Sequence, residues 1–343
     1  MTWGHAEGKR PAVVAPVSPD ALTRVLRRSP VPRSSIAAHR PLDDRRIGDG
    51  PIDACPVIVD IRSSDAFRRG HIRGAISIPR GRLPRSLFLL PPRERSLLMV
   101  GRDGITAADG ARFLAGRGRT RVAWLDGSSR DLPRDLLRPG AEANRAWEPA
   151  RLLREFIARL PRTGEAIDLA CGSGREAAFL ALHRSRVLGV DILPDALGQA
   201  RALARAARVP PGRLALCRTD LTDARTVGVL LPPRRFRVIC CFRYLDRTLL
   251  PVIARALAPG GWVIYETFLQ AQARAGRTPT RSSFLLKPGE LRAAFEATGG
   301  IEIIHYAEGP DERGDHLASL VARSAASLRG PLLDAGMDTV REQ

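Results

Sequence analysis

Apolar runs alternate with helical patterns through the second half of the chain. The runs are residues 166–170, 186–190, 214–217, 236–242 and 262–268. Each is short and rich in aliphatic residues, as strands buried in a parallel sheet are. Segments between them, such as 194–207, carry apolar residues at helical spacing. Two further strands are expected at 301–306 and 316–323, which would add an antiparallel edge strand. The pattern predicts an α/β fold with a doubly wound sheet.

The first of these strands leads into a glycine-rich turn. Gly172 and Gly174 directly follow the run 166–170, and residues 175–182 then read as a helix. Strand, glycine turn and helix form the opening unit of a nucleotide-type binding site. Glycine suits this turn because it tolerates positive φ and lets a ligand approach the backbone.

Three carboxylates stand near the ends of the predicted strands. Asp168 lies in the first strand, Asp191 ends the second and Asp220 follows the third. Asp191 comes about 20 residues after the glycine turn, where an acid can bind both hydroxyls of a ribose. Sheets of this kind bind ligands at the carboxyl ends of their strands. We therefore expect the ligand site at this edge.

The run Asp168–Gly174, DLACGSG, resembles the first motif of the class I S-adenosylmethionine-dependent methyltransferases. A dinucleotide fingerprint is disfavoured because Ala177 stands where its third glycine belongs, and no Lys-Ser/Thr pair follows to form a P-loop. The resemblance implies S-adenosylmethionine as cofactor, with Asp191 on its ribose. The cofactor-binding residues that it implies are Asp168, Ala170, Gly172, Gly174, Asp191, Ile192, Asp220, Leu221 and Phe242.

The end of the fourth strand should face the methyl group that is transferred. Arg243, Tyr244 and Arg175 are the substrate-side candidates. Tyr244 is the catalytic candidate, as a group that orients the nucleophile or acts as a weak base; packing against the cofactor is an equal alternative. The cofactor carries the reactivity and the protein supplies orientation. An anionic nucleophile needs no general base, so we expect a small, soft acceptor, a thiol or a chalcogen oxyanion.

Two later segments narrow the resemblance. Tyr265–Phe268 (YETF) and Phe284–Leu291 (FLLKPGEL) look like the small methyltransferases related to tellurite-resistance proteins. This similarity covers about Trp147–Arg323. Residues 270–283 lie between the two segments, are polar, and are expected to form a lid.

The first half of the chain carries a separate motif. Pro56–Asp60 is an apolar strand, and the sequence DIRSSDAFRRGHIRGAISIP runs over Asp60–Pro79. Its Asp-x-Arg start and its GHIRGA segment resemble the rhodanese family. The similarity covers about Pro51–Pro133 and implies a small α/β domain, in which a parallel sheet is flanked by helices.

The nucleophile of that family is missing from this chain. In rhodaneses a catalytic cysteine opens a loop whose backbone N–H groups favour the thiolate. The Arg-Gly pair at 117–118 fixes the register, and Gly101 then occupies the cysteine position. Persulfide chemistry cannot occur on glycine, and Asp103 adds an acid to a loop that normally attracts anions. The degenerate site comprises Gly101, Arg102, Gly104, Asp60 and Arg62. We expect this domain to act as a scaffold or to dock a protein partner.

The length of the chain and a linker-like segment near its middle predict two domains. The chain has 343 residues, and residues 128–144 are polar and interrupted by Pro and Gly, as linkers are. The expected divisions are a flexible arm at 1–45 with a short helix at 18–28, a rhodanese-like domain at 46–140, a methyltransferase domain at 141–325 and a tail at 326–343.

The positive charge changes this picture little. The formal net charge is +19, but lysine occurs only at Lys9 and Lys287, and arginine is scattered through every segment. Such usage is typical of a GC-rich genome and does not favour a nucleic-acid partner. A patch that binds RNA stays as an alternative, which the salt dependence of binding would test. An RNA methyltransferase is disfavoured because Phe242–Tyr244 is not the Asn/Asp-Pro-Pro-Tyr/Phe run of base-amino methylation.

Cysteine spacing and apolar segments exclude other classes. The cysteines show no CxxC pair and no zinc spacing, so no metal is expected: Cys55, Cys171, Cys217, Cys240 and Cys241. No segment has the length of a transmembrane helix, and residues 1–10 lack the apolar core of a signal peptide, so we expect a cytoplasmic protein. The expected partner of the active site is a small methyl acceptor. The alternative function is a regulatory protein that binds the cofactor without methyl transfer.

Overall fold

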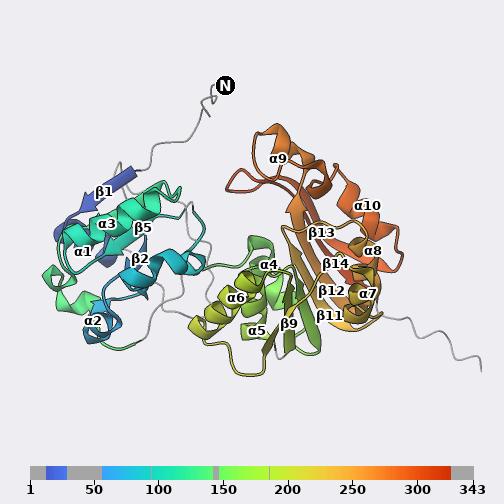
Figure 1. Ribbon diagram of the computed structural model, residues 1–343, viewed down its shortest axis with the longest axis horizontal. Helices are drawn as coiled ribbons and strands as arrows, with labels where there is room; N and C mark the ends of the chain where they lie inside the picture. Colours follow the sequence, from blue (N-terminus) through green and yellow to red (C-terminus); the bar gives the residue numbers. More distant parts are fainter. Residues whose placement is uncertain (1–12, 29–55, 94, 142–146, 185, 326–343) are drawn as a thin grey trace, which may run out of the picture. The chain divides into compact units, whose positions relative to one another are not determined.

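The computed structural model describes residues 13–28, 56–93, 95–141, 147–184 and 186–325. The chain divides into two compact units, Met1–Glu148 and Pro149–Gln343, here called unit 1 and unit 2. Figure 1 shows a sheet with packed helices in each unit. The predicted tail at 326–343 lies outside the described residues.

Unit 1 contains a five-stranded sheet in the order β1-β6-β5-β2-β4, and all neighbouring strands are parallel. Its strands are β1 (Val13–Val17), β2 (Val57–Asp60), β4 (Ile76–Ser77), β5 (Leu97–Val100) and β6 (Arg121–Leu125). Two short strands pair antiparallel beside it, β3 (His71–Ile72) and β7 (Leu137–Arg138). The helices are α1 (Pro19–Arg28), α2 (Ser64–Arg69) and α3 (Gly104–Ala115), with 3-10 turns η1 (Arg80–Arg85), η2 (Leu87–Leu89), η3 (Ser129–Asp131) and η4 (Arg134–Leu136).

Both faces of the unit 1 sheet are buried. Ile58 of β2 packs in one core cluster with Leu22 of α1, whereas the next residue, Val59, packs in a second cluster with Leu114 of α3. Successive side chains of a strand point to opposite faces, so a strand between two helix layers must be apolar throughout. This explains the continuous apolar runs of the sequence in this region.

The predicted arm at 1–45 is partly wrong. Within it, Val13–Val17 forms β1 and pairs with β6 at the edge of the sheet, and Leu22 and Leu26 of α1 are buried. Pro16 concealed this strand in the sequence, because proline is compatible only with edge strands or strand ends. The helix expected at 18–28 is confirmed as α1. The other residues of the predicted arm lie outside the described part of the chain.

Unit 2 contains a seven-stranded sheet in the order β10-β9-β8-β11-β12-β14-β13. Its strands are β8 (Glu165–Leu169), β9 (Arg186–Asp191), β10 (Leu214–Arg218), β11 (Phe236–Phe242), β12 (Leu257–Phe268), β13 (Ile301–Pro310) and β14 (His316–Ser324). Its helices are α4 (Arg151–Phe156), α5 (Arg175–His183), α6 (Pro194–Ala206), α7 (Ala224–Leu230), α8 (Leu249–Ala256), α9 (Gln270–Arg274) and α10 (Glu290–Glu296), with η5 (Ile157–Arg159) and η6 (Ser282–Phe284).

Strand order places the ligand crevice of unit 2. From β8 the chain builds outward through β9 and β10, and it then returns to the other side of β8 with β11. In such sheets the crevice lies at the carboxyl ends of the strands where the order reverses, here β8 and β11. All pairs from β10 to β12 are parallel, and β14 is antiparallel to β12. The predicted doubly wound sheet with an antiparallel edge is confirmed.

One core face of this sheet is built from the alternate residues of its central strands. Ile239 of β11 and Val263 of β12 pack with Ile253 of α8, Phe295 of α10 and Val227 of α7. Helices α5 and α6 pack on β8, β9 and β10 from the chain segments between those strands. Figure 1 shows these two helices beside β9 and α7 and α8 beside β11 and β12.

Candidate functional site

The turn after β8 adopts left-handed backbone at three alternate positions. Ala170, Gly172 and Gly174 have φ of 52°, 52° and 75°. A Cβ added at Gly172 would meet no atom within 4 Å, whereas one at Gly174 would lie 2.6 Å from Ala200 Cβ in α6. Gly174 therefore permits the packing of α5 on α6, and Gly172 leaves open space beside the backbone. Open space next to exposed backbone is what a ligand needs in order to approach the turn.

The second strand brings a carboxylate to this turn. Asp191 ends β9, and its two carboxylate oxygens accept the N–H groups of Gly172 (2.8 Å) and Leu193 (2.9 Å). The side chain is buried. These bonds fix the direction of the carboxylate, and a carboxylate oxygen has a further lone pair for a ligand hydroxyl. Asp191 thus joins the glycine turn in one group, as the sequence predicts.

A buried carboxylate without a full set of partners lies under the turn. Asp168 is 1% exposed, and its Oδ2 has no hydrogen-bond partner. Burial raises its pKa well above the usual range, and Glu176 and Asp191 raise it further. An unsatisfied buried oxygen costs free energy until a donor reaches it. A cationic ligand with N–H donors, such as S-adenosylmethionine with its ammonium group, fits this requirement.

The third strand contributes a looser part of the predicted site. Asp220 is exposed, and its Oδ1 accepts the N–H (2.9 Å) and the hydroxyl (2.7 Å) of Thr222, which lowers its pKa. Leu221 is buried, while Ile192 next to Asp191 is an exposed large hydrophobic residue. Apolar surface of this kind near the glycine turn can cover a flat ring system.

The predicted substrate side begins where β11 ends. Phe242 and Tyr244 are partly buried there. Burial raises the pKa of Tyr244 to about 12. The phenolate is therefore scarce at neutral pH, which makes Tyr244 a poor general base. Its backbone oxygen accepts the hydroxyl of Tyr265 at 2.9 Å, so this residue is also part of the packing below the site.

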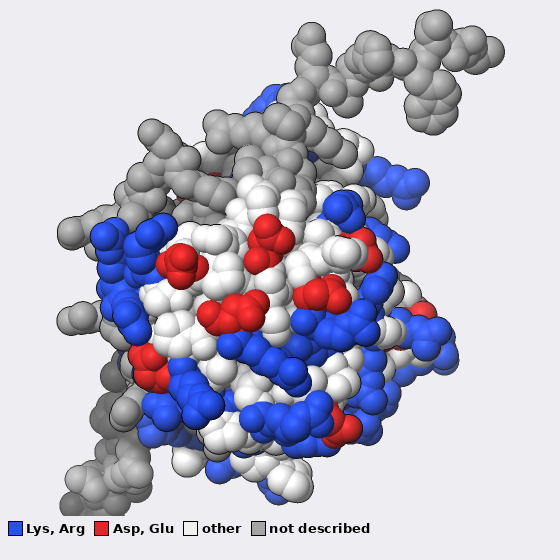
Figure 2. All heavy atoms as spheres, turned by 90° about the vertical axis from the view of Figure 1, so that its left-hand side faces the viewer, with Lys and Arg blue, Asp and Glu red and all other residues white. Residues whose placement is uncertain are grey.

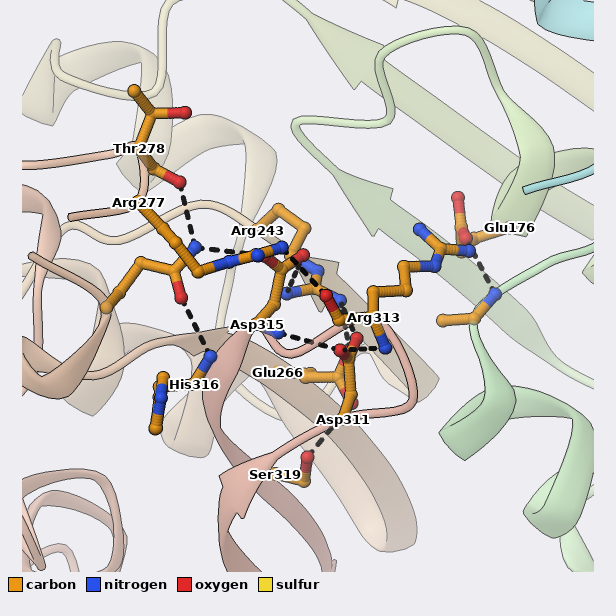
Figure 3. A network of polar contacts seen from close by, with 12 residues as sticks. Glu176, Arg243, Glu266, Arg277, Thr278, Asp311, Arg313, Asp315, His316 and Ser319 are labelled. Atoms are coloured by element: carbon orange, nitrogen blue, oxygen red, sulfur yellow. Dashed lines mark hydrogen bonds and ion pairs between the residues drawn. The ribbon is translucent and has the colours of Figure 1, made fainter. Parts of the chain in front are cut away.

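Arg243 stands in the centre of a network of carboxylates (Figure 3). It has a left-handed φ of 60°, and its guanidinium carbon lies 4.9 Å from the centroid of the Phe268 ring. Its guanidinium nitrogens lie 3.5 Å from Glu266, 3.2 Å from Asp311 and 3.8 Å from Asp315. Three carboxylates on one guanidinium leave little positive charge for an incoming anion.

Two acidic side chains of this region escaped the sequence analysis as site residues. Glu176, in the first turn of α5, accepts the N–H of Ala150 at 3.0 Å, and Glu266 of β12 accepts the hydroxyl of Ser319 at 2.9 Å. Burial raises the pKa of both carboxyls. Figure 3 draws both in the same network of polar contacts as Arg243. Their positions in the sequence could have identified them: Glu176 follows the glycine turn, and Glu266 lies near the end of a strand.

The segment predicted as a lid is tied to the turn between β13 and β14. Gln272 of α9 is buried, and its amide donates to Thr278 O and to Asp315, both at 2.9 Å. Its amide oxygen accepts the N–H of His316 at 2.8 Å, and Arg277 pairs with Asp315 at 2.9 Å. The two segments therefore form one wall beside Arg243 (Figure 3).

In unit 1, the Asp-x-Arg pair has a structural role. The Arg62 guanidinium pairs with Asp60 and also donates to Ser129 Oγ (2.7 Å) and to Gly70 O (2.8 Å). His71 stacks on the Phe67 ring at a centroid distance of 3.7 Å. These contacts hold loops together and leave the pair well satisfied.

The loop at the expected cysteine position is closed. A Cβ added at Gly101 would lie 2.5 Å from Ala107 N and 2.8 Å from Asp103 O. Asp103 caps α3, and its Oδ1 accepts the N–H (2.8 Å) and the hydroxyl (2.6 Å) of Thr106, which lowers its pKa to about 2. The Thr106 N–H at this helix end therefore already donates to an anion of the chain itself.

Charge, metal ligands and apolar helices add little to the site. On the face drawn in Figure 2, acidic side chains lie among the basic ones. Among the residues described, there is no group of three or more His, Cys, Asp or Glu side chains that could hold a metal ion. No helix in the described ranges is long and apolar enough to cross a membrane.

Two protein-family models match the chain. The model described as "Methyltransferase domain" matches residues 166–261, and that described as "Rhodanese-like domain" matches residues 44–132. The predicted methyltransferase class is therefore confirmed, and with it S-adenosylmethionine, the methyl donor of that class. The predicted rhodanese-like domain is confirmed as well.

Two relatives are similar over different lengths. A Schizosaccharomyces pombe protein named "Uncharacterized protein UNK4.09" is 23% identical, over 77% of this chain and 92% of that protein. A Methylobacterium nodulans protein named trans-aconitate 2-methyltransferase is 30% identical, over 34% of this chain and 43% of that protein.

Solved structures are similar to about half of the chain. An S-adenosylmethionine-dependent methyltransferase from Mesorhizobium loti is 19% identical over 51% of this chain and 98% of that one, with a TM-score of 0.39. The N-methyltransferase NodS from Bradyrhizobium japonicum, in complex with S-adenosyl-L-homocysteine, is 17% identical over 51% of this chain and 84% of that one, with a TM-score of 0.40.

Proposed function

We propose that unit 2 transfers a methyl group from S-adenosylmethionine to a small, soft nucleophile, and that unit 1 does not transfer sulfur. The observation that carries the proposal is the open glycine turn with its bound carboxylate. Gly172 has free space at its Cβ position, and its N–H holds Asp191 at 2.8 Å. A ligand can thus reach the backbone and the carboxylate from one side.

Each part of the donor has a counterpart in this group of residues. Asp191 would bind the ribose hydroxyls, and the unpartnered Oδ2 of Asp168 would accept from the ammonium group. Exposed Ile192 and buried Leu221 would cover the adenine. The bound donor supplies an activated methyl on a sulfonium centre. The residues of the chain orient it and exclude water.

The acceptor side supports a nucleophile that needs no strong base. Tyr244 has a pKa of about 12 and is a poor base. The carboxylates around Arg243 disfavour an anion there, so of the two proposed acceptor classes they favour the thiol. A thiol or a chalcogen oxyanion arrives with a polarisable nucleophile and fits this requirement. The likeness of Tyr265–Phe268 and Phe284–Leu291 to tellurite-resistance-related methyltransferases supports tellurite and selenite as test acceptors. One relative is named for trans-aconitate, which therefore belongs in the same screen.

Unit 1 lacks the means for sulfur transfer in this proposal. Gly101 stands where the rhodanese family has its cysteine, and the nearby backbone fills the space that a side chain would need. Asp103 occupies the helix N-terminus that would otherwise stabilise a thiolate. A scaffold or a docking surface for a protein partner is the role that remains for this domain.

Calorimetric titration of S-adenosylmethionine into the full chain tests the donor site. We expect the wild type to bind with micromolar affinity. The affinity of Asp191→Ala should be lower by a factor of about ten or more. Asp195→Ala, which removes an exposed acid of α6, is the matched control and should bind like the wild type. Absence of binding to a folded wild type would contradict the proposal.

An acceptor screen separates enzyme from regulator. Methyl transfer from labelled donor would be measured with tellurite, selenite, small thiols and trans-aconitate. Methylation of a thiol or of a chalcogen oxyanion supports the proposed acceptor. Methylation of trans-aconitate alone overturns it. Donor binding without turnover of any acceptor would favour a cofactor-binding regulatory protein.

A further inference from the structure

Several arginines lie at the end of the unit 2 sheet where the parallel strands begin. This end is opposite the donor site, which lies at the carboxyl ends of the strands. Arg237 is the second residue of β11, and Arg323 lies near the end of antiparallel β14. Trp262 of β12 pairs in register with Val238 on one side and with Arg323 on the other. Topology therefore brings these side chains to one end of neighbouring strands.

The guanidinium groups of this cluster share neighbours. The guanidinium carbons of Arg159 and Arg323 lie 5.5 Å and 6.0 Å from the centroid of the Trp262 ring. A Cβ added at Gly260 would lie 3.4 Å from Arg323 Nη2 and 3.9 Å from Arg237 Nη1. Both arginines thus approach the same piece of bare backbone.

Two glycines make room for Arg237. A Cβ added at Gly164 would lie only 2.4 Å from Arg237 Cγ, and Gly260 lies under the other end of the side chain. Arg237 donates to Pro259 O at 2.7 Å, which holds the guanidinium in this position. The side chain is therefore held at both ends between loops.

No described carboxylate forms an ion pair within this cluster, although Glu302 of β13 stands opposite Arg323 in the strand register. In the described ranges of the chain, none of Arg159, Arg184, Arg237 and Arg323 forms an ion pair with Asp or Glu; their polar contacts are backbone oxygens and aromatic rings. Neighbouring Arg235, by contrast, pairs with Glu165 at 2.6 Å. Like charges at such spacing repel one another unless a counter-charge is bound.

Arg184 provides an independent sign of a missing ligand. It is 2% exposed and donates to Thr163 O at 2.9 Å, yet its Nε and Nη1 have no hydrogen-bond partner. Burial lowers its pKa, and the charge of nearby Arg237 contributes to the same direction. Buried donors without acceptors cost free energy that a bound acceptor would recover.

We propose that Arg159, Arg184, Arg237 and Arg323 form a binding site for a multiply charged, phosphate-type oxyanion. Guanidinium groups match phosphate oxygens in paired hydrogen bonds, and several of them together favour a dianion over a single carboxylate. The bound anion would link η5, α5, β11 and β14 at the edge opposite the methyl donor. Its binding would stabilise the folded unit by mass action.

Calorimetric titration of inorganic phosphate into the full chain, at constant ionic strength, tests the site. The wild type should bind saturably, and Arg237→Gln and Arg323→Gln should each weaken binding about tenfold. Arg201→Gln removes an exposed arginine of α6 and is the charge-matched control. No saturable binding by the wild type overturns the proposal, as does an equal loss in Arg201→Gln.

Two further measurements complete the test. Phosphate should raise the Tm of the wild type and of the control but not that of the Arg237→Gln/Arg323→Gln double variant. Equal increases of Tm in all three proteins would overturn the proposal. A short single-stranded RNA then identifies the source of the phosphate group. Displacement of phosphate by RNA assigns the site to a polynucleotide backbone, and no displacement assigns it to free phosphate or a monoester.

Discussion

Each unit of the chain joins a buried parallel strand to a helix through a glycine-containing loop, and the two loops differ in one respect. In unit 2, α5 begins after Gly174 without a side-chain cap, and Gly172 borders open space. In unit 1, Asp103 caps α3, and backbone atoms surround Gly101. The same architecture is open in one unit and closed in the other.

The comparison teaches that the residues at the start of the helix, more than the fold, decide whether such a loop can bind a ligand. Free N–H groups at a helix N-terminus attract an anion or a polar ligand. Asp103 takes that place with a carboxylate of the chain itself, and its hydrogen bonds with Thr106 hold its pKa at about 2. In unit 1 the helix N-terminus is therefore capped by a side chain of the chain itself, whereas in unit 2 it is left for a ligand.

The largest expected effect comes from a steric clash at Gly174, the glycine of the open loop that packs against α6. Gly174→Ala adds a Cβ 2.6 Å from Ala200 Cβ at a φ of +75°, so we expect it to lower the unfolding free energy of unit 2 by about 2 to 4 kcal/mol. Urea denaturation measures the loss. Gly172→Ala is the control: it shares the left-handed φ but meets no atom, and should lose only about 1 to 2 kcal/mol. Equal losses would contradict the steric argument.

Placing a cysteine in the closed loop of unit 1 should not produce sulfur transfer. Gly101→Cys adds a Cβ 2.5 Å from Ala107 N, so we expect a loss of about 1 to 3 kcal/mol and no transfer of sulfur from thiosulfate to cyanide. Gly81→Ala, at a position with nothing within 4 Å, is the control in the same unit. Sulfurtransferase activity at wild-type stability would show that the loop opens readily.

A pH-dependent effect distinguishes the buried acid of unit 2. The folded-state pKa of Asp168 is raised, so the folded chain binds its proton more tightly than the unfolded chain, and stability from this group falls as pH rises above the unfolded pKa. Asp168→Asn should therefore gain thermal stability relative to the wild type with rising pH, while its affinity for S-adenosylmethionine falls. Asp220→Asn, at an exposed acid with a lowered pKa, should not gain stability with rising pH.

The smallest effect is expected at Tyr244. A phenol with a pKa of about 12 contributes little as a base, so Tyr244→Phe should keep kcat/KM within about threefold and leave its pH profile unchanged. Steady-state assays with the acceptor found in the screen provide the measurement. Loss of one limb of the pH profile would instead assign the proton transfer to this phenol.

Much of the fold was predictable from local pattern. The run Phe236–Phe242 was expected as a strand and is β11 residue for residue, because a buried parallel strand is apolar on both faces. The edge strand β1 was missed because its proline resembles loop sequence. The strand expected at 262–268 begins earlier, at Leu257.

The sequence by itself determined the order of strands and helices, the glycine turn and the positions of Asp168 and Asp191 along the chain. These follow from spacing over a few residues, which the backbone periods of helix and strand impose. Only the tertiary structure decided which groups meet. Arg243 reaches Asp311 across 68 residues, Gly101 is closed by its own loop, and Arg184 is buried with no acceptor for its Nε and Nη1. Such contacts depend on the packing of distant segments, for which spacing along the chain carries no distance information.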